Sequence, residues 1–353
     1  PLVEALIADG HQVSVLAPRD DSCAALQALG CRYLPLEMNV KGLNPIDDLS
    51  LMARYRRIFC RERPDVVLSY TIKNNLFGAL AARMTGTPFL PNVTGLGTAF
   101  LSGGALQRLA EGLYRAAFSK LSVVFFQNSD DRDLFIAHRL VRPEQARLLP
   151  GSGIDLDRFA PADWPSADAP PTFLMIARLL RDKGVLEYVE AARSIRAEYP
   201  QVQFRLLGAT GSENRTAIDA LTVQSWVDEG VIDYLGTTDD VRPEIAQAHC
   251  VVLPSYREGA PRTLIEAAAM ARPVIATDVP GCRAVLDAEL SGYLCAPRDE
   301  ASLAEAMRRF LALSPKAQQA MGQAGRDKMA REFDQAIVVA RYDGAIRELT
   351  GGC

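Results

Sequence analysis

Short apolar, β-rich runs alternate along the chain with longer stretches of helical periodicity. In the first part of the chain the pattern predicts four strands, at residues 12–17, 66–70, 88–93 and 123–127. Helices are predicted between these strands at residues 50–62, 76–85 and 105–120. This alternation is typical of βαβ units, in which crossover helices connect the parallel strands of one sheet.

The same alternation starts again in the second part of the chain. Strands are predicted at residues 172–177, 203–207, 231–235, 250–254, 273–277 and 292–295. Helices are predicted at residues 183–198, 213–228, 261–270 and 302–313, and two more at 315–332 and 335–349. The fold class predicted from these patterns is α/β, with two Rossmann-like doubly wound domains facing a central cleft.

The alternation breaks between residues 148 and 161, and a stretch rich in Pro, Ala and Asp continues to residue 171. We therefore predict an N-terminal domain at 1–158, a second domain at 159–332 and a closing helix at 333–353 that packs back on the first domain. The sequence opens on a helix at residues 2–9, whereas a doubly wound domain begins with a strand. We expect the first strand and its glycine-rich turn to be missing from this sequence.

Composition narrows the class of protein. The length of 353 residues suits two domains better than one core. A formal charge of −4 argues against nucleic acid as the main partner. Seven dispersed cysteines without a C-x-x-C pair indicate reduced thiols and a cytoplasmic protein. No segment has the roughly 18 consecutive apolar residues of a membrane-spanning helix.

The strongest chemical signal is R-E-G-A-P-R-T-L-I-E at Arg257–Glu266, directly after the strand predicted at 250–254. A strand, a glycine turn and a helix start together indicate the carboxyl end of a parallel sheet, where α/β folds bind ligands. Pro261 suits the first helical position. The free amides of Arg262 to Leu264, with the helix dipole, then form an anion site for a diphosphate, and Gly259 lets the backbone approach the ligand.

Charged residues near this loop are suited to binding a diphosphate and hydroxyl groups. Arg178 ends the strand predicted at 172–177 and Lys183 opens the next helix, so that both cations can neutralise a diphosphate without a metal. Glu258 and Glu266 can accept hydrogen bonds from sugar or ribose hydroxyls. Glu266 lies within an apolar run, where an ordinary surface glutamate is not expected.

The E-x7-E spacing, the R-x4-K-G after a strand and the D-x-x-R-F of the linker resemble retaining glycosyltransferase family 4, of GT-B fold. The resemblance implies that Arg178 and Lys183 hold the donor diphosphate and that Glu258 contacts the transferred sugar. The donor-binding residues it implies are Gly208, Gly211, Tyr234, Leu235, Gly236, Gly259, Ala260, Pro261, Thr263, Leu264 and Glu266. Among these, the Thr263 and Leu264 amides would meet phosphate, Glu266 the ribose, and Tyr234 to Gly236 the base.

Three motifs in the first half resemble a subgroup that assembles bacterial surface polysaccharides and lipid-linked glycans. They are S-Y-T-I-K-N-N, N-V-T-G-L-G and P-G-S-G. The implied reaction moves a hexose or N-acetylhexosamine from a UDP-sugar to a polysaccharide or lipid-linked acceptor. The candidates for lining the acceptor side are Tyr70, Lys73, Asn74, Thr94 and Gly95. The alternative is that these residues only pack their own loops. Thr94 takes the position at which family members commonly have a histidine.

Neither a cofactor nor a metal is expected. Asp155 and Asp157 spell D-x-D, a metal-binding pattern in other transferases, but they lie in the linker and not after a strand. A retaining reaction on the donor's front face, with the leaving phosphate taking the acceptor proton, needs no strong protein base. An inverting reaction would need one in the first domain, and no good candidate is present there.

Two further questions stay open from the sequence. The segment 101–120 mixes apolar residues with cations, and Arg54 to Arg63 form a basic run, so peripheral contact with an anionic membrane and ordinary packing are both compatible with the pattern. A sugar-nucleotide epimerase of the same fold and a non-catalytic two-domain sugar-binding protein are the alternative functions.

Overall fold

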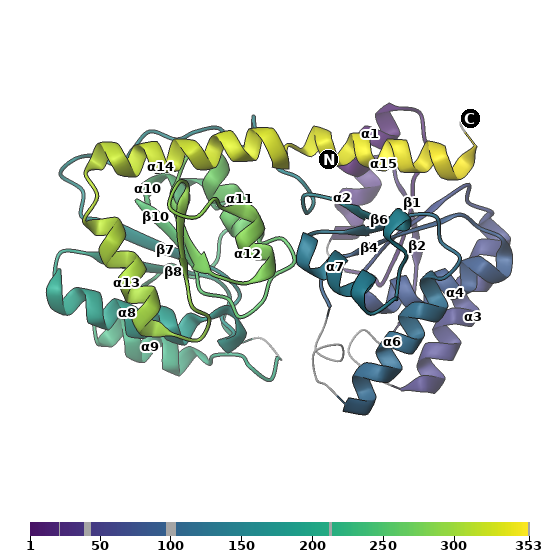
Figure 1. Ribbon diagram of the computed structural model, residues 1–353, viewed down its shortest axis with the longest axis horizontal. Helices are drawn as coiled ribbons and strands as arrows, with labels where there is room; N and C mark the ends of the chain where they lie inside the picture. The colour runs from purple at the N-terminus through teal and green to yellow at the C-terminus, as the bar shows by residue number, and fades with distance from the viewer. Residues whose placement is uncertain (21, 39–43, 97–103, 212–213, 352–353) are drawn as a thin grey trace. The chain divides into compact units, whose positions relative to one another are not determined.

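The protein is described by a computed structural model that covers residues 1–20, 22–38, 44–96, 104–211 and 214–351. The chain divides into two compact units. Unit 1 comprises Pro1–Leu149 and Gln335–Cys353, and unit 2 comprises Pro150–Asp334. Both units are built from parallel strands and helices, as Figure 1 shows.

The strands of unit 1 form two sheets. β1 (Ser14–Ala17) pairs with β2 (Arg32–Pro35), and a separate four-stranded sheet has the order β3 (Val67–Tyr70), β4 (Phe89–Val93), β5 (Val124–Phe126) and β6 (Ala146–Leu148). The helices of this unit are α1 (Leu2–Ala8), α2 (Ser22–Ala28), α3 (Pro45–Glu62), α4 (Ile72–Thr85), α6 (Gly104–Phe118), α7 (Ser129–Ala137) and α15 (Gln335–Thr350).

Consecutive side chains of β5 point to opposite faces of the four-stranded sheet, as the strand geometry requires. Phe126 packs in the core that α3, α4, α6 and α7 cover, next to Phe135. Phe125 packs in a second core on the other face, edge to face with Tyr342 of α15. The C-terminal helix therefore belongs to the hydrophobic core of unit 1.

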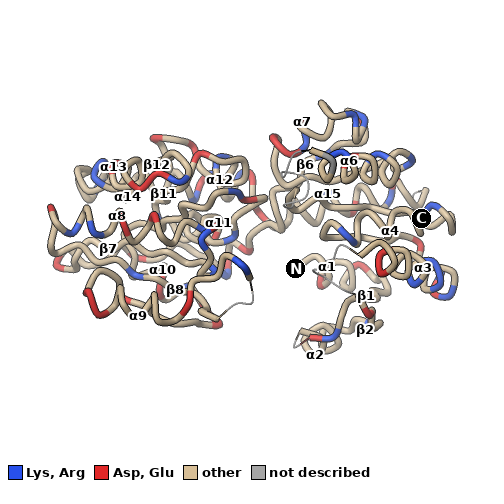
Figure 2. Tube along the Cα trace, turned by 90° about the horizontal axis from the view of Figure 1, so that it is seen from below, with Lys and Arg blue, Asp and Glu red and all other residues tan. Residues whose placement is uncertain are grey.

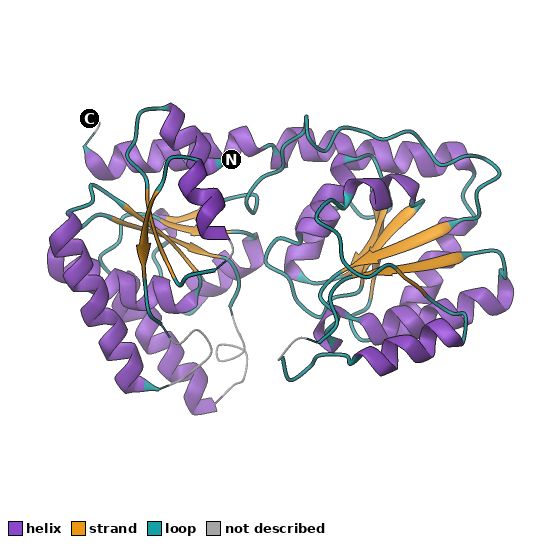
Figure 3. Cartoon of the chain, turned by 180° about the vertical axis from the view of Figure 1, so that it is seen from behind, coloured by secondary structure: helices purple, strands orange, loops and turns teal. Residues whose placement is uncertain are grey.

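Unit 2 contains one six-stranded parallel sheet with helices on both faces (Figure 3). Its strand order is β12 (Gly292–Cys295), β11 (Val274–Thr277), β10 (Cys250–Leu253), β7 (Thr172–Ile176), β8 (Gln203–Leu207) and β9 (Asp233–Tyr234). The helices are α8 (Val185–Glu198), α9 (Ala220–Asp228), α10 (Arg242–Gln247), α11 (Arg262–Ala269), α12 (Pro280–Val285), α13 (Glu300–Leu311) and α14 (Pro315–Lys328). The order reverses at β7, which makes the β7–β10 border the topological switch point where open α/β sheets bind ligands.

The division between the units falls at Leu149, earlier than the boundary predicted at residue 158. The turn 150–161 has the composition of a linker, but it packs in unit 2. Ile154 and Phe159 are buried in the core of that unit, and the Ile154 N–H donates to Phe333 O at 2.8 Å. The chain returns to unit 1 at Gln335, close to the predicted start of the closing helix at 333.

Most predicted elements are present with ends shifted by a few residues, but several short ones were not predicted: α2, β2, α7, β6, α10 and α12. The helix predicted at 213–228 begins at Ala220, because the Asp219 carboxylate caps it by accepting the Thr222 N–H at 2.8 Å. Its predicted first residue lies outside the described part. None of the described helices is long and apolar enough to cross a lipid bilayer.

Candidate functional site

The carboxyl ends of β7 and β10 lie next to each other in unit 2, since Phe173 pairs with Cys250 in the parallel register. The segment after β7 carries Arg178, and the loop after β10 leads through Glu258 into α11. The Thr263 hydroxyl at the start of α11 donates to Ile176 O, the last residue of β7, at 3.0 Å. This bond fixes the N-terminus of α11 beside the segment that carries Arg178.

Lys183 and Glu258 meet in an ion pair between the two loops. The Lys183 side chain is 21% exposed and that of Glu258 12%, so the pair is largely but not fully shielded. Arg178 is exposed and forms no ion pair with any described residue. Lys183 ends a 3₁₀ turn at Arg181–Lys183 and does not open α8, because Gly184 in the left-handed region (φ 75°) separates the two.

Gly184 allows the backbones of these loops to touch. A Cβ at this position would lie 2.1 Å from Pro254 O. The Tyr256 N–H donates to Asp182 O at 2.9 Å, and the Ser255 hydroxyl donates to the same carbonyl at 3.2 Å. The cation-bearing loop is thus held on the end of β10 by hydrogen bonds to its backbone as well as by the Lys183–Glu258 ion pair.

The N-terminus of α11 differs from the prediction in two details. Pro261 is the residue before the helix, which starts at Arg262. The Leu264 N–H is already bonded to Pro261 O at 3.1 Å, so Leu264 does not offer a free amide, contrary to our prediction. The amides of Arg262 and Thr263 have no acceptor in the described part of the chain, and they are the donors left for an anion.

Glu266 forms an i,i+4 ion pair with Arg262 at 2.9 Å. Only one carboxylate oxygen, Oε1, accepts hydrogen bonds from the guanidinium. The Glu266 side chain is 12% exposed, whereas Arg262 is 64% exposed and extends into solvent. The second oxygen, Oε2, has no hydrogen-bond donor among the described residues and is available to a ligand.

Residues predicted near the base cluster at the ends of β8 and β9. The Tyr234 hydroxyl donates to Gly208 O, and the Gly208 N–H donates to Gly236 O, both at 2.8 Å. A Cβ on Gly208 would lie 1.8 Å from Ala177 O, so only glycine allows this approach to the end of β7. The Leu235 N–H continues the ladder to Leu206 O. Gly211 follows on the surface with φ 75°.

Gly281 supports the Glu258 loop, and it was not among the predicted residues. Its N–H donates to Glu258 O at 3.2 Å, and a Cβ there would lie 2.5 Å from the same oxygen. Burial raises the pKa of the neighbouring Cys282 thiol, with a further contribution from the Glu258 charge. The V-P-G-C pattern after strand β11 is the signal that could have identified this contact.

The candidates for the acceptor side all lie in unit 1, but several have structural partners. Lys73 forms an ion pair with Asp48 at 2.9 Å, and Asn74 accepts a hydrogen bond from the Tyr55 hydroxyl at 2.8 Å. Thr94 and Gly95 follow β4, with Thr94 exposed to solvent. The side chains of Lys73 and Asn74 therefore fasten α4 to α3.

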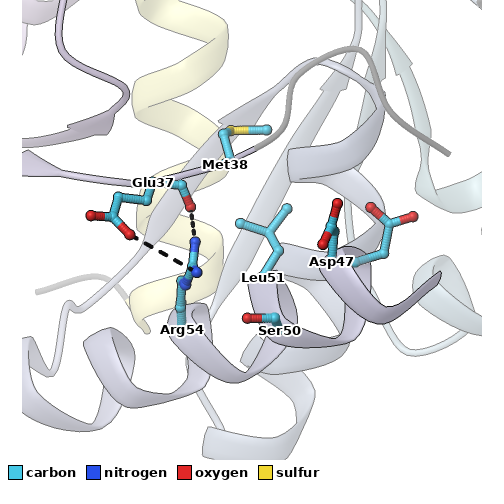
Figure 4. Close-up of a pocket in the computed structure, with 7 residues that line it drawn as sticks. Glu37, Met38, Asp47, Ser50, Leu51 and Arg54 are labelled. Atoms are coloured by element: carbon cyan, nitrogen blue, oxygen red, sulfur yellow. Dashed lines mark hydrogen bonds and ion pairs between the residues drawn. The ribbon is translucent and has the colours of Figure 1, made fainter. Parts of the chain in front are cut away.

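Tyr70, the remaining candidate, packs against α15. Its ring lies 6.4 Å from that of Tyr342, and the side chain is 38% exposed. A pocket of about 340 Å³ opens beside α3, lined by Glu37, Asp47, Asp48, Leu51 and Arg54 among others (Figure 4). Its lining includes three carboxylates and one cation, and one of the carboxylates, Asp48, pairs with the candidate Lys73.

Asp155 of the D-x-D sequence has a structural role in its own turn. Its Oδ1 accepts the N–H groups of Asp157 at 3.1 Å and Arg158 at 2.9 Å. Within the described ranges, no group of three or more His, Cys, Asp or Glu side chains is placed to hold a metal ion.

Basic residues mark α3 and α6 in unit 1, as Figure 2 shows. On α6, Leu109 is 61% exposed and Leu106 41%, whereas Phe118 is fully buried. Arg115 donates to His138 O at 3.2 Å and is used in packing. The predicted amphipathic segment thus has an exposed apolar part and a buried part, and its first residues, 101–103, lie outside the described structure.

Two family models match most of the chain. The model described as "Glycosyl transferase 4-like domain" matches residues 1–151, and "Glycosyl transferases group 1" matches residues 170–312. The chain belongs to this family of two-domain glycosyltransferases, and its architecture is the GT-B fold.

Two curated relatives are similar to this chain over most of their length. The N,N'-diacetylbacillosaminyl-diphospho-undecaprenol α-1,3-N-acetylgalactosaminyltransferase of Campylobacter jejuni is 26% identical, with 97% of this chain and 92% of the relative covered. The UDP-Gal:α-D-GlcNAc-diphosphoundecaprenol α-1,3-galactosyltransferase of Escherichia coli is 25% identical, with coverage of 86% and 79%. A glycosyltransferase structure from Rickettsia africae aligns with a TM-score of 0.79 at 18% identity, covering 99% of this chain and 93% of its own.

Proposed function

We propose that the protein is a retaining glycosyltransferase that moves a hexose or N-acetylhexosamine from a UDP-sugar to a lipid-linked or polysaccharide acceptor. The observation that carries the proposal is the assembly of cations, free amides and carboxylates at the β7–β10 border of unit 2. The names of the two relatives above support the choice of an undecaprenyl diphosphate-linked acceptor, and one of them names a UDP-sugar donor.

Each group in this assembly has a chemical task. Arg178 and the amides of Arg262 and Thr263 bind the diphosphate and stabilise the negative charge that develops as it departs. Lys183, paired with Glu258 before the donor arrives, exchanges part of that contact for a phosphate oxygen. Glu258 then accepts a hydroxyl of the transferred sugar, and Glu266 Oε2 accepts a ribose hydroxyl.

The proposed reaction uses no metal, because protein cations and helix amides supply the positive charge that a divalent ion would bring. We expect the rate of sugar transfer to be unchanged after dialysis against EDTA. A loss of activity that Mg²⁺ or Mn²⁺ restores would contradict this part of the proposal.

The stereochemistry of the product tests the proposal directly. The purified chain is incubated with UDP-N-acetylgalactosamine or UDP-galactose and a short-chain prenyl diphosphate-linked sugar, and the new anomeric proton is assigned by NMR. We expect an α-linked product, with the configuration of the donor retained. A β-linked product would contradict retention, and donor conversion in the absence of acceptor would indicate an epimerase.

A further inference from the structure

Unit 1 contains a second basic site, far along the chain from the residues proposed to bind the donor. It is a pocket of about 530 Å³ between β5, β6, α7 and α15, and three arginines from three different elements line it. Arg132 comes from α7, Arg147 from β6 and Arg341 from α15. None of the described residues that line this pocket is acidic, although Glu348 and Asp133 contact two of the three arginines.

Each of the three guanidinium groups is held by a hydrogen bond but keeps further N–H donors without a bond to a described residue. Arg147 donates through one terminal nitrogen to Glu348, at 2.7 and 3.0 Å, and Arg132 donates through Nε to Asp133 at 2.7 Å. Arg341 donates to Leu148 O at 2.6 Å and forms no ion pair within the described ranges. Since each guanidinium carries five N–H donors, most of their donors remain available.

The floor of the pocket is apolar. Phe125 lies beside Arg147, because the two are register partners on β5 and β6, and it is 1% exposed. On α15, Gly344 faces open space: a Cβ added there would meet no atom within 4 Å. The pocket thus combines a cationic rim with room for carbon atoms.

We propose that this pocket of unit 1 binds a phosphate ester. Glu348 and Asp133 each occupy one side of a guanidinium, but the N–H donors left on the three forks favour an oxyanion, and the planar forks match the geometry of phosphate oxygens. The apolar floor accommodates the carbon side of the ester. The site is independent of the donor site, which is built from residues of unit 2 alone.

Binding of a soluble probe tests the site. sn-Glycerol 3-phosphate is titrated into the intact chain by calorimetry in saturating UDP, which keeps the probe out of the donor site, with glycerol as the uncharged control. We expect Arg147→Gln and Arg341→Gln each to weaken binding by about tenfold or more, since each removes charge-assisted hydrogen bonds. The matched control is Arg347→Gln, on the same helix but 68% exposed and paired with Asp343, which leaves binding unchanged.

A second variant, which leaves the net charge unchanged, tests whether binding is lost because the protein misfolds. Gly344→Met extends a side chain into the open space and suits a helix better than glycine, so the fold is kept while the pocket is filled. We expect it to abolish binding of the probe, and Arg178→Ala in unit 2 to leave that binding intact. Equal affinity in the wild type, Arg341→Gln and Gly344→Met would overturn the proposal.

Vesicle sedimentation identifies the source of the phosphate. The same variants are mixed with vesicles of phosphatidylglycerol or, as a control, phosphatidylcholine. Loss of sedimentation with phosphatidylglycerol in Arg341→Gln and Gly344→Met, but not in Arg347→Gln, assigns the site to a lipid headgroup. Unchanged sedimentation, together with loss of glycerol phosphate binding, assigns it to a soluble ester.

Discussion

Two glycines of unit 2 have almost the same backbone conformation but different surroundings. Gly184 (φ 75°) lies against Pro254 O, which would be 2.1 Å from a Cβ, whereas a Cβ at Gly236 (φ 71°) would meet no atom within 4 Å. Their comparison separates the cost of a left-handed backbone from the cost of a steric clash between the two site loops.

We expect Gly236→Ala to lower the free energy of unfolding by about 1–2 kcal/mol, the cost of a left-handed residue with a side chain. Gly184→Ala should lower it by more, because the loop that carries Lys183 must also move away from β10. Urea unfolding followed by circular dichroism measures both values. Equal losses would show that the two loops are not in close contact.

His249 is a buried histidine of unit 2. Its Nδ1 accepts the Thr172 N–H at 3.2 Å, its ring lies edge-on to Trp164, and it is 7% exposed. Burial, helped by the nearby Arg272 guanidinium, lowers the pKa of His249. The folded state therefore resists protonation, while the unfolded chain takes up a proton near pH 6.5.

It follows that the His249 contribution to stability is complete above about pH 6.5 and is lost as the pH falls below it. We expect the free energy of unfolding of the wild type to decrease between pH 7.5 and 5.5, and His249→Asn to reduce that slope. His11→Asn, at an exposed position, is the matched control and should keep it. A wild-type slope in His249→Asn would assign the pH dependence to other groups.

At the scale of elements, α15 completes the core of unit 1. The Tyr342 hydroxyl accepts a hydrogen bond from the buried Asn92 side chain at 3.0 Å, and its ring packs on Phe125 at 5.1 Å. Burial raises the pKa of Tyr342 well above its usual range, so the hydroxyl stays protonated at all physiological pH values.

Tyr342→Phe keeps the ring and removes only the hydroxyl. We expect a loss of about 1–3 kcal/mol in the free energy of unfolding, because the buried Asn92 amide is left without an acceptor. Tyr342→Ala should lose more, since it also opens a cavity against Phe125. Thermal unfolding of the two variants and the wild type measures which variant loses more stability. An unchanged stability of Tyr342→Phe would show that water replaces the hydroxyl.

Elements with continuous apolar runs were predictable from the sequence, whereas several elements without such a run were not. The strand at Cys250–Leu253 is buried throughout and was predicted at nearly the correct ends. β2 and β6 have four and three residues and alternate weakly, which gives no clear period. The domain boundary was placed too late because glycine and proline in the turn 150–161 outweighed the buried Ile154 and Phe159.

The placement of Arg178, Lys183 and Glu258 after strand ends was predictable from the sequence, whereas their role in binding a donor stays a prediction. The sequence could not predict the ion-pair or hydrogen-bond partner of each of these residues. The Leu264 amide is occupied by a local bond to Pro261 O, but the pairing of Lys183 with Glu258 depends on how two loops meet that are 75 residues apart in the chain. Gly281 was missed for the same reason.

At the scale of the whole molecule, the proposed donor site is built from residues of unit 2 alone. Its strands, both cations, both glutamates and the α11 amides lie within Pro150–Asp334. The formal charge of the chain is −4, yet the exposed Arg178 and the free amides create a local positive end at one border of the sheet. Nucleotide binding should therefore depend on this border and not on the net charge.

Calorimetric titration of UDP tests this claim most directly. We expect Arg178→Ala to weaken UDP binding by at least about tenfold, because it removes charge-assisted hydrogen bonds to the diphosphate. Arg181→Ala, an exposed arginine three residues away in the same loop, should bind UDP like the wild type. Equal affinity of Arg178→Ala and the wild type would contradict the account, as would an equal loss in Arg181→Ala.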